Sequence, residues 1–350
     1  MARRLFLHIG MPKCATTTVQ DFLGANRAGL AEHGIFYDYH RSYRESDQGN
    51  GVQLARDLMW GNPAPVAEFF DFFLRRDGDV VLSSENFFGL ARSPAIGGVL
   101  DNIRARGFEV VVICYLRRQD LWIESDYKQQ VKGGSDWIGS LPDLLKERSA
   151  ARVLNYNWML GNWARYAGQD QVIAVPLRPG QAPEHPVRAF LDVIGAADLL
   201  APEATLPRLR NVSPPTGLIE PARYLKAAML GHGMSTVQAT REVERFFELA
   251  PRIGPVPPRR FLLSHHARLR LLQRFQISNE RLAERFLGGE GFAPSLEKDA
   301  ASERQLSDEA AALLARYWLH YRPALRTRSR LRRGLHRLLR KRSAPQAGQG

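Results

Sequence analysis

Short apolar runs that alternate with helical patterns constrain the fold of this chain more than any other feature. The runs are rich in Val, Ile and Leu and cover residues 5–9, 35–37, 80–83, 110–116 and 172–175. Consecutive parallel strands need a long connection, usually a helix, so this alternation is typical of a mostly parallel sheet. We therefore predict an α/β fold of three layers, P-loop-like, in which helices cover both faces of the sheet.

The second half of the chain follows a different pattern. Between residues 206 and 321 the apolar spacing is helical, and Gly and Pro cluster at 231–233 and 254–258, where they interrupt the helices. We expect residues 1–205 to form an α/β core and residues 206–321 to form a helical region that completes the same domain. Residues 322–350 are expected to be a separate tail.

Several features indicate a soluble, cytoplasmic protein. No apolar run reaches the roughly 20 residues that a membrane-spanning helix needs. The N-terminal run is too short for a signal peptide and is interrupted by His8 and Pro12. The two cysteines, Cys14 and Cys114, are too few for a disulfide framework, which agrees with a reducing compartment.

The net charge of +13 comes mostly from the tail. Residues 321–350 contain no acidic residue, and their basic residues are Arg322, Arg326, Arg328, Arg330, Arg332, Arg333, Arg337, Arg340, Lys341 and Arg342. The rest of the chain is therefore close to neutral, and no specific nucleic-acid partner is expected for it.

The tail also contains a stripe of leucines, formed by Leu331, Leu335, Leu338 and Leu339. A basic helix with one apolar face can lie on an anionic membrane surface, which predicts peripheral contact with the inner face of the membrane. A disordered tail, or one that touches nucleic acid, is the alternative.

A connection between the first apolar run and the first helical pattern has the clearest chemistry. A helix N-terminus offers unpaired N–H groups and about half a positive charge, which together favour an oxyanion. Lys13 adds a full charge, and three threonines add hydroxyl donors. The predicted anion-binding loop consists of Gly10, Lys13, Cys14, Ala15, Thr16, Thr17 and Thr18.

This loop differs from the loop of ATPases, which reads G-x-x-x-x-G-K-[ST] and places its Lys directly before a magnesium-binding hydroxyl. Here Lys13 comes three residues before Thr16, and the second glycine is missing. The ligand should therefore bind without an obligatory metal. From the loop alone, an ordinary helix N-terminus with a solvated lysine stays open as an alternative.

A second group of candidate residues follows the run 110–116. Arg117 comes next, at the edge of the sheet where ligands bind in doubly wound folds, and Ser125 lies eight residues further on. A guanidinium and a hydroxyl can hold a phosphate together. Arg118 competes with Arg117 for this role, and a surface Arg with an unrelated Ser is the alternative.

In these two segments the chain resembles the PAPS-dependent sulfotransferases, which use 3′-phosphoadenosine 5′-phosphosulfate (PAPS) as donor. The family loop usually reads K-x-G-T-T, and here Ala15 replaces the glycine. The resemblance implies that the loop binds the 5′-phosphosulfate and that Arg117 and Ser125 hold the 3′-phosphate. It covers roughly residues 4–290, with specific motifs only in the first 130.

Sulfuryl transfer needs a base for the acceptor's proton and a group that stabilises charge on the leaving phosphate. Lys13 is our candidate for the second role. Glu85 follows the run 80–83 and resembles a glutamate that glycan sulfotransferases often place after a comparable strand, so it is the first candidate base, with an ion-pair partner or a helix cap as the alternative. His8 is the second, although its position inside a strand is typical of a hydrogen-bonded core residue.

Other polar residues have weaker cases. Asn211 and Ser213 are candidates for donor or acceptor contact by family analogy, with a loop cap as the alternative. The pair His265 and His266 has no metal-ligand context, so no metal site is expected.

The sequence thus predicts an enzyme that transfers a sulfuryl group from PAPS to a hydroxyl or amine. Its partners would be PAPS, adenosine 3′,5′-bisphosphate and an unknown glycan, lipid or small-molecule acceptor, with an envelope glycan or glycolipid favoured if the tail binds membrane. Two other functions stay open. One is an atypical P-loop kinase, and the other is a non-catalytic nucleotide-binding or membrane-adaptor protein.

Overall fold

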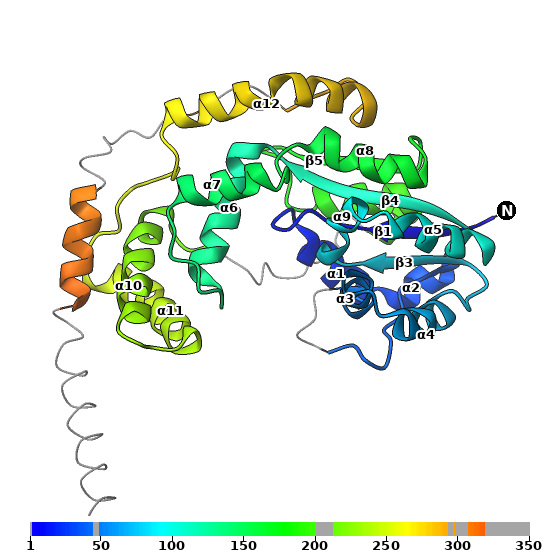
Figure 1. Cartoon of the computed structure of the whole chain (residues 1–350), viewed down its shortest axis with the longest axis horizontal. Coiled ribbons are helices and arrows are strands. Elements are labelled where there is room, and N and C mark those ends of the chain that lie inside the picture. The colour runs from blue at the N-terminus through cyan, green and yellow to red at the C-terminus, as the bar shows by residue number, and fades with distance from the viewer. Residues whose placement is uncertain (1, 45–48, 201–212, 293–296, 298–306, 319–350) are drawn as a thin grey trace, which may run out of the picture. The chain divides into compact units, whose positions relative to one another are not determined.

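The computed structural model describes residues 2–44, 49–200, 213–292, 297 and 307–318 (Figure 1). The chain divides into two compact units. Unit 1 consists of Met1–Tyr127, Ser140–Val212 and His265–Glu297, and unit 2 of Lys128–Gly139, Ser213–Ser264 and Lys298–Gly350. The predicted basic tail lies outside the described residues. No helix in the described ranges has the length and apolar character needed to cross a bilayer.

The described part of unit 1 is built on a five-stranded sheet in which all neighbouring strands are parallel. The strands are β1 (Arg3–His8), β2 (Ile35–Phe36), β3 (Asp79–Ser83), β4 (Phe108–Arg117) and β5 (Val172–Leu177). Their order is β2-β3-β1-β4-β5, so β1 lies in the middle. Each predicted apolar run forms a strand, which confirms the predicted α/β class.

Helices cover both faces of this sheet (Figure 1). In one layer α1 (Thr16–Ala25) packs against α9 (His185–Ile194). In another layer α5 (Ala95–Ala105) and α8 (Tyr156–Ala167) pack against β4 and against each other, and α12 (His265–Phe286) packs on α8. Because both faces are covered, the middle of β4 is fully buried and almost entirely apolar.

The other elements of unit 1 connect these layers. They are α2 (Arg27–Glu32), α3 (Val52–Trp60), α4 (Pro63–Phe73), α7 (Leu141–Ala150) and the 3₁₀ turns Glu85–Phe87, Leu90–Arg92 and Ala197–Leu199. Helix α6 (Gln119–Lys132) begins directly after β4.

The apolar pattern after β1 predicted one helix, and the structure has two, α1 and α2. Asn26 separates them, with φ −109° and ψ 25°. Both its backbone N–H and its side-chain amide donate to the carbonyl of Phe22. An asparagine side chain that bonds the backbone in this way competes with helix continuation, which the apolar spacing could not reveal.

The described part of unit 2 is helical, as predicted. Helix α10 (Ile219–Gly231) follows the 3₁₀ turn Thr216–Leu218 and packs against α11 (Thr236–Ile253), and residues 307–318 form a further helical segment. Lys226 is fully buried and donates to the carbonyls of Gln130, Val131 and Gly133 at 2.9, 3.3 and 3.3 Å. These carbonyls lie at the end of α6, so Lys226 caps its C-terminus.

Candidate functional site

Residues that follow three neighbouring strands meet at one edge of the sheet. β1 lies between β3 and β4, and His8 pairs with Ser83 on one side and with Ile113 on the other. The loop after β1, the turn that begins at Glu85, and Arg117 at the end of β4 therefore share the carboxyl edge. In open α/β sheets, ligands bind at this edge beside the central strands.

The loop between β1 and α1 has an unusual backbone. Gly10 has a φ of +40°, and a Cβ atom there would lie 2.4 Å from Cγ2 of Thr16, so the position requires glycine. Lys13 and Ala15 also have left-handed angles, with φ of 65° and 59°. Such angles cost a residue with a side chain about 1 kcal/mol or more. Ala15 thus occupies a backbone conformation that favours glycine.

The first turn of α1 offers backbone donors to a ligand. Ala15 precedes the helix without a side-chain cap. In the described part of the chain, no hydrogen bond uses the backbone N–H groups of Ala15, Thr16 and Thr17. Thr17 and Thr18 are half-buried next to them. With Lys13 nearby, these N–H groups form a cradle whose donors suit an oxyanion. We call it the anion cradle.

Glu85 lies against the anion cradle. The hydroxyl of Thr16 donates a hydrogen bond to Oε1 of Glu85, and the backbone N–H of Lys13 also donates to this carboxylate. Burial raises the pKa of Glu85, whereas the hydrogen bonds and the charge of Lys13 oppose that rise. A carboxylate whose pKa is raised accepts a proton more readily than an ordinary glutamate, which suits a general base.

The thiol of Cys14 marks where the candidate groups converge. Cys14 is fully buried, and burial raises the pKa of its thiol to about 12, so the thiol is neutral and unreactive. The charges of Arg117, Glu85 and Lys13 all act on this thiol. The candidate groups that follow β1, β3 and β4 therefore act on the same buried position.

The structure distinguishes the two candidate arginines. Arg117 is half-buried, and its side chain makes no hydrogen bond or ion pair with any described residue. Its carbonyl accepts a hydrogen bond of 2.8 Å from Tyr156, which fixes the backbone. Arg118 is buried, and its guanidinium is committed to Asp120 at 2.7 Å. Of the pair, Arg117 is therefore the one with an available guanidinium.

Ser125 lies on α6 and is half-buried. No hydrogen bond joins Ser125 to Arg117 among the described residues. The helix itself is held against the loop after β1, because Nε1 of Trp122 donates to the carbonyl of Pro12 at 2.7 Å. Ser125 follows Trp122 by three residues and so lies about one turn further along α6.

His8 is a core residue. It is fully buried, Nδ1 lies 2.8 Å from Oγ of Ser83, and its ring contacts those of Tyr115 and Phe190. Burial lowers the pKa of His8 to about 3, so the ring is neutral and a weak proton acceptor at pH 7. These properties agree with the core alternative, and they favour Glu85 as the base.

Several residues that position the site were not singled out from the sequence. Ser83 accepts a hydrogen bond of 2.9 Å from Gln20 of α1, which ties the first helix to β3. The side-chain amide of Asn50 bonds two backbone groups of β3. It donates to the carbonyl of Val81 and accepts from the N–H of Ser83, at 2.9 Å each. Asn50 lies between two glycines, a turn signal that gives no hint of a strand contact.

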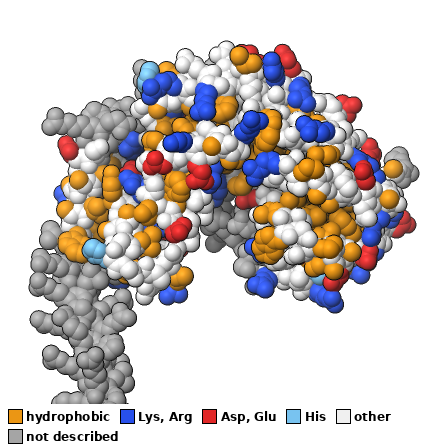
Figure 2. Space-filling model, in the orientation of Figure 1, with side chains coloured by type: hydrophobic (Ala, Val, Ile, Leu, Met, Phe, Trp, Pro, Cys, Tyr) orange, Lys and Arg blue, Asp and Glu red, His pale blue; other side chains and the backbone are white. Residues whose placement is uncertain are grey.

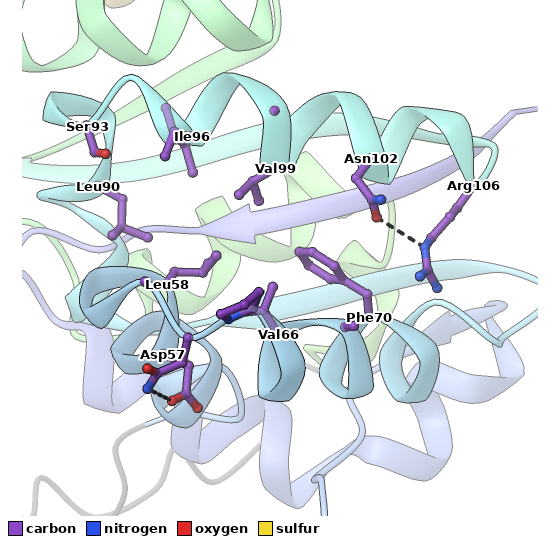
Figure 3. Close-up of a pocket in the computed structure, with 16 residues that line it drawn as sticks. Asp57, Leu58, Val66, Phe70, Leu90, Ser93, Ile96, Val99, Asn102 and Arg106 are labelled. Atoms are coloured by element: carbon purple, nitrogen blue, oxygen red, sulfur yellow. Dashed lines mark hydrogen bonds between the residues drawn. The ribbon is translucent and has the colours of Figure 1, made fainter.

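A separate cavity of about 430 Å³ lies between α3, α4 and α5 (Figure 3). Its walls are mostly apolar, and none of the residues of the anion cradle line it. Its polar residues bond to one another, Asn62 to Asp57 at 2.8 Å and Arg106 to Asn102 at 3.2 Å. Hydrophobic side chains gather on the surface over this part of unit 1 (Figure 2), and the nearby Trp60 is 70% exposed.

The remaining sequence candidates lie elsewhere. Ser213 is exposed and belongs to unit 2, and Asn211 lies outside the described residues. His266 is exposed at the start of α12. Among the described residues, no three His, Cys, Asp or Glu side chains gather in a way that could hold a metal ion.

Comparison with known proteins gives distant likenesses. No protein-family model matches the chain. An uncharacterized protein from Archaeoglobus fulgidus is 28% identical over 180 residues, 51% of this chain and 46% of that protein, so the match spans about half the length of the relative. A sulfotransferase from Alicyclobacillus acidocaldarius has a similar structure with a TM-score of 0.37 and 14% identity, over 70% of this chain and 97% of that one. Neither likeness assigns the chain to a family.

Proposed function

We propose that this chain is a sulfotransferase that moves a sulfuryl group from PAPS to a hydroxyl or amine of an acceptor. The observation that carries the proposal is that Glu85 bonds Thr16 in the first turn of α1, beside the unused N–H groups of this helix, while the available guanidinium of Arg117 follows β4 at the same edge of the sheet. This arrangement combines an anion-binding helix terminus, a carboxylate with a raised pKa and an available guanidinium at one edge of a parallel sheet.

The anion cradle fits the 5′-phosphosulfate of the donor. The backbone N–H groups of Ala15, Thr16 and Thr17 supply donors that no described residue uses. Gly10 keeps the loop close to the helix, because any side chain there would overlap Thr16. Lys13 would stabilise the negative charge that develops on the leaving phosphate oxygen.

Arg117 and Ser125 would hold the 3′-phosphate. The guanidinium of Arg117 can bond two phosphate oxygens at once, and the hydroxyl of Ser125 can supply a third bond. The anchored backbone of Arg117 and the contact between Trp122 and Pro12 fix the two elements that carry these side chains. A rigid support of this kind limits the entropy lost when the donor binds.

In the proposed reaction the acceptor oxygen or nitrogen attacks the sulfur in line with the bond to the leaving phosphate. The new S–O or S–N bond forms as the S–O bond to the phosphate breaks, and adenosine 3′,5′-bisphosphate leaves. The acceptor's proton passes to Glu85, and positioning together with charge stabilisation supplies most of the rate enhancement. None of these roles needs a metal ion.

The acceptor is proposed to be a glycan, lipid or small molecule. A glycolipid or envelope glycan would follow if the basic tail binds the inner face of a membrane, because the enzyme would then work in the cytoplasm at that surface. Vesicle sedimentation of the full chain with and without residues 322–350 tests this part. Binding to anionic vesicles that is lost on truncation supports it, and equal sedimentation rejects it.

The enzymatic proposal is tested by incubating the purified protein with donor labelled in its sulfuryl group and with extracts separated into lipid, glycan and small-molecule fractions. We expect label to appear in one fraction with the unmodified chain and to be lost with Lys13→Ala. Transfer of the γ-phosphate from magnesium ATP, with no transfer of label from PAPS, would instead support the kinase alternative.

A further inference from the structure

Glu85 occupies two hydrogen-bond donors that lie beside the anion cradle and that an anion bound there would also contact. The hydroxyl of Thr16 and the backbone N–H of Lys13 are both directed at its carboxylate. A hydroxyl or an amide N–H carries one proton and donates one good hydrogen bond. A phosphosulfate bound to these donors and the carboxylate of Glu85 therefore exclude each other.

Charge makes the exclusion stronger, because the ligand and the carboxylate are both negative. The charged and titratable groups around the carboxylate are few among the described residues. Lys13 faces it from the loop, and the Cys14 thiol beside it is neutral, with a pKa of about 12. From β4, Arg117 acts on the same thiol, and on β1 His8 is neutral, with a pKa of about 3.

The backbone under Glu85 is fixed, so only its side chain has to move. Ser84 donates its N–H to the carbonyl of His8 at 3.1 Å, and its hydroxyl accepts from the N–H of Asn86 at 3.1 Å. Gly10 lies next to this side chain, because an added Cβ there would lie 3.7 Å from Cγ of Glu85. Glu85 is half-buried and not fully enclosed, so its carboxylate can turn away from Thr16.

We propose that Glu85 is a built-in occupant of the donor site, and that the anionic group of the donor displaces it from Thr16 and Lys13. The carboxylate becomes free to take a proton only after the donor has bound. This inference rests on the proposed function and adds to it a base that donor binding releases. Thr16 is then a positioning residue, which holds the base in the free enzyme and the donor in the complex.

The test is calorimetric titration of the full chain with adenosine 3′,5′-bisphosphate between pH 5 and pH 8. Glu85→Gln removes the competing charge but keeps the shape, so we expect it to bind about tenfold more tightly than the unmodified chain at pH 8. The advantage should shrink as the pH falls toward the pKa of Glu85. Glu32→Gln, at the exposed end of α2, makes the same change in net charge and should bind like the unmodified chain.

A second measurement needs no variant. Reaction of the unmodified chain with a water-soluble carbodiimide, followed by mass spectrometry, reports how accessible each carboxylate is. Labelling of Glu85 should rise when adenosine 3′,5′-bisphosphate is bound, because the carboxylate has left its hydrogen bonds. Labelling that stays constant or falls would overturn the displacement.

The outcomes separate the two proposals. Equal affinity of the unmodified chain and Glu85→Gln at every pH would reject the displacement and leave the donor site intact. Absence of binding in all three proteins would reject the donor site, and the displacement with it.

Discussion

Arg117 and Arg118 are consecutive in the chain, yet their side chains have opposite environments. The guanidinium of Arg118 is buried and bonds both oxygens of Asp120, at 2.7 and 3.0 Å, and Arg268 of α12 pairs with the same carboxylate at 2.9 Å. The guanidinium of Arg117 bonds no described residue. Arg118 therefore helps to hold α12 against the rest of unit 1, and Arg117 is available to a ligand.

This difference predicts opposite effects of two alanine substitutions. Arg117→Ala should weaken binding of adenosine 3′,5′-bisphosphate about 10- to 100-fold, the value of a charge-assisted hydrogen bond, without changing stability. Arg118→Ala should lower the free energy of unfolding of unit 1 by about 3 kcal/mol, because it breaks a buried ion pair. Calorimetry and urea unfolding measure the two effects, with the exposed Arg165→Ala as control. Loss of stability in Arg117→Ala would contradict the assignment.

Substitution of the two candidate catalytic residues should separate binding from chemistry. Glu85→Gln should lower kcat about 10²- to 10⁴-fold, since it removes a general base, although the donor should bind more tightly because the competing charge is gone. Lys13→Ala should lower kcat about 100- to 1000-fold and also weaken donor binding, because the lysine carries charge in the anion cradle. Steady-state kinetics with the acceptor fraction identified by label transfer checks both. Unchanged kcat in Glu85→Gln would exclude it as the base.

Because His8 is buried and neutral, we expect the protein to lose stability in acid. Its folded pKa of about 3 lies below the ordinary value of 6.5, so the unfolded chain takes up a proton that the folded chain refuses. The stability that His8 contributes is full above pH 6.5 and is lost as the pH falls toward 3, by about 2 kcal/mol between pH 6.5 and pH 5. Urea unfolding should show this loss in the unmodified chain and a smaller one in His8→Asn. The exposed His266→Asn should behave like the unmodified chain.

We expect substitution of Ala15 by glycine to leave the stability of the protein nearly unchanged. Its φ of 59° strains alanine, so relief of this strain should offset the entropy that glycine adds to the unfolded chain, and Ala15→Gly should change stability by less than about 1 kcal/mol in either direction. Ala164→Gly, within α8, should cost about 1 kcal/mol. Thermal unfolding compares the two. An equal loss in both variants would show that the loop does not strain Ala15.

The sheet and its edge could be predicted from the sequence because they depend on local patterns. Every apolar run forms a strand, and the positions after β1, β3 and β4 follow from parallel pairing alone. The division between Arg117 and Arg118 could not be predicted, because it depends on Asp120 and on Arg268, which lies about 150 residues further along the chain. Neither residue belongs to a motif.

The contact between Thr16 and Glu85 shows the same limit within the site. The sequence predicted that both residues lie at one edge of the sheet, with Thr16 contacting the donor and Glu85 taking the proton of the acceptor. The hydrogen bond between them was not predicted. The hydrogen bond between them arises from the packing of α1 against the end of β3, which Gln20 and Ser83 help to fix. A pattern along the chain does not show which of two nearby acceptors a hydroxyl will bond.

The most direct test of the donor site is calorimetric titration, without magnesium, of the unmodified chain and Arg117→Ala with adenosine 3′,5′-bisphosphate and with adenosine 5′-phosphate. We expect the bisphosphate to bind at least about tenfold more tightly than the monophosphate, and this preference to disappear in Arg117→Ala. Binding of magnesium ATP in preference to the bisphosphate, or no preference for the 3′-phosphate in the unmodified chain, would contradict the proposed sulfotransferase.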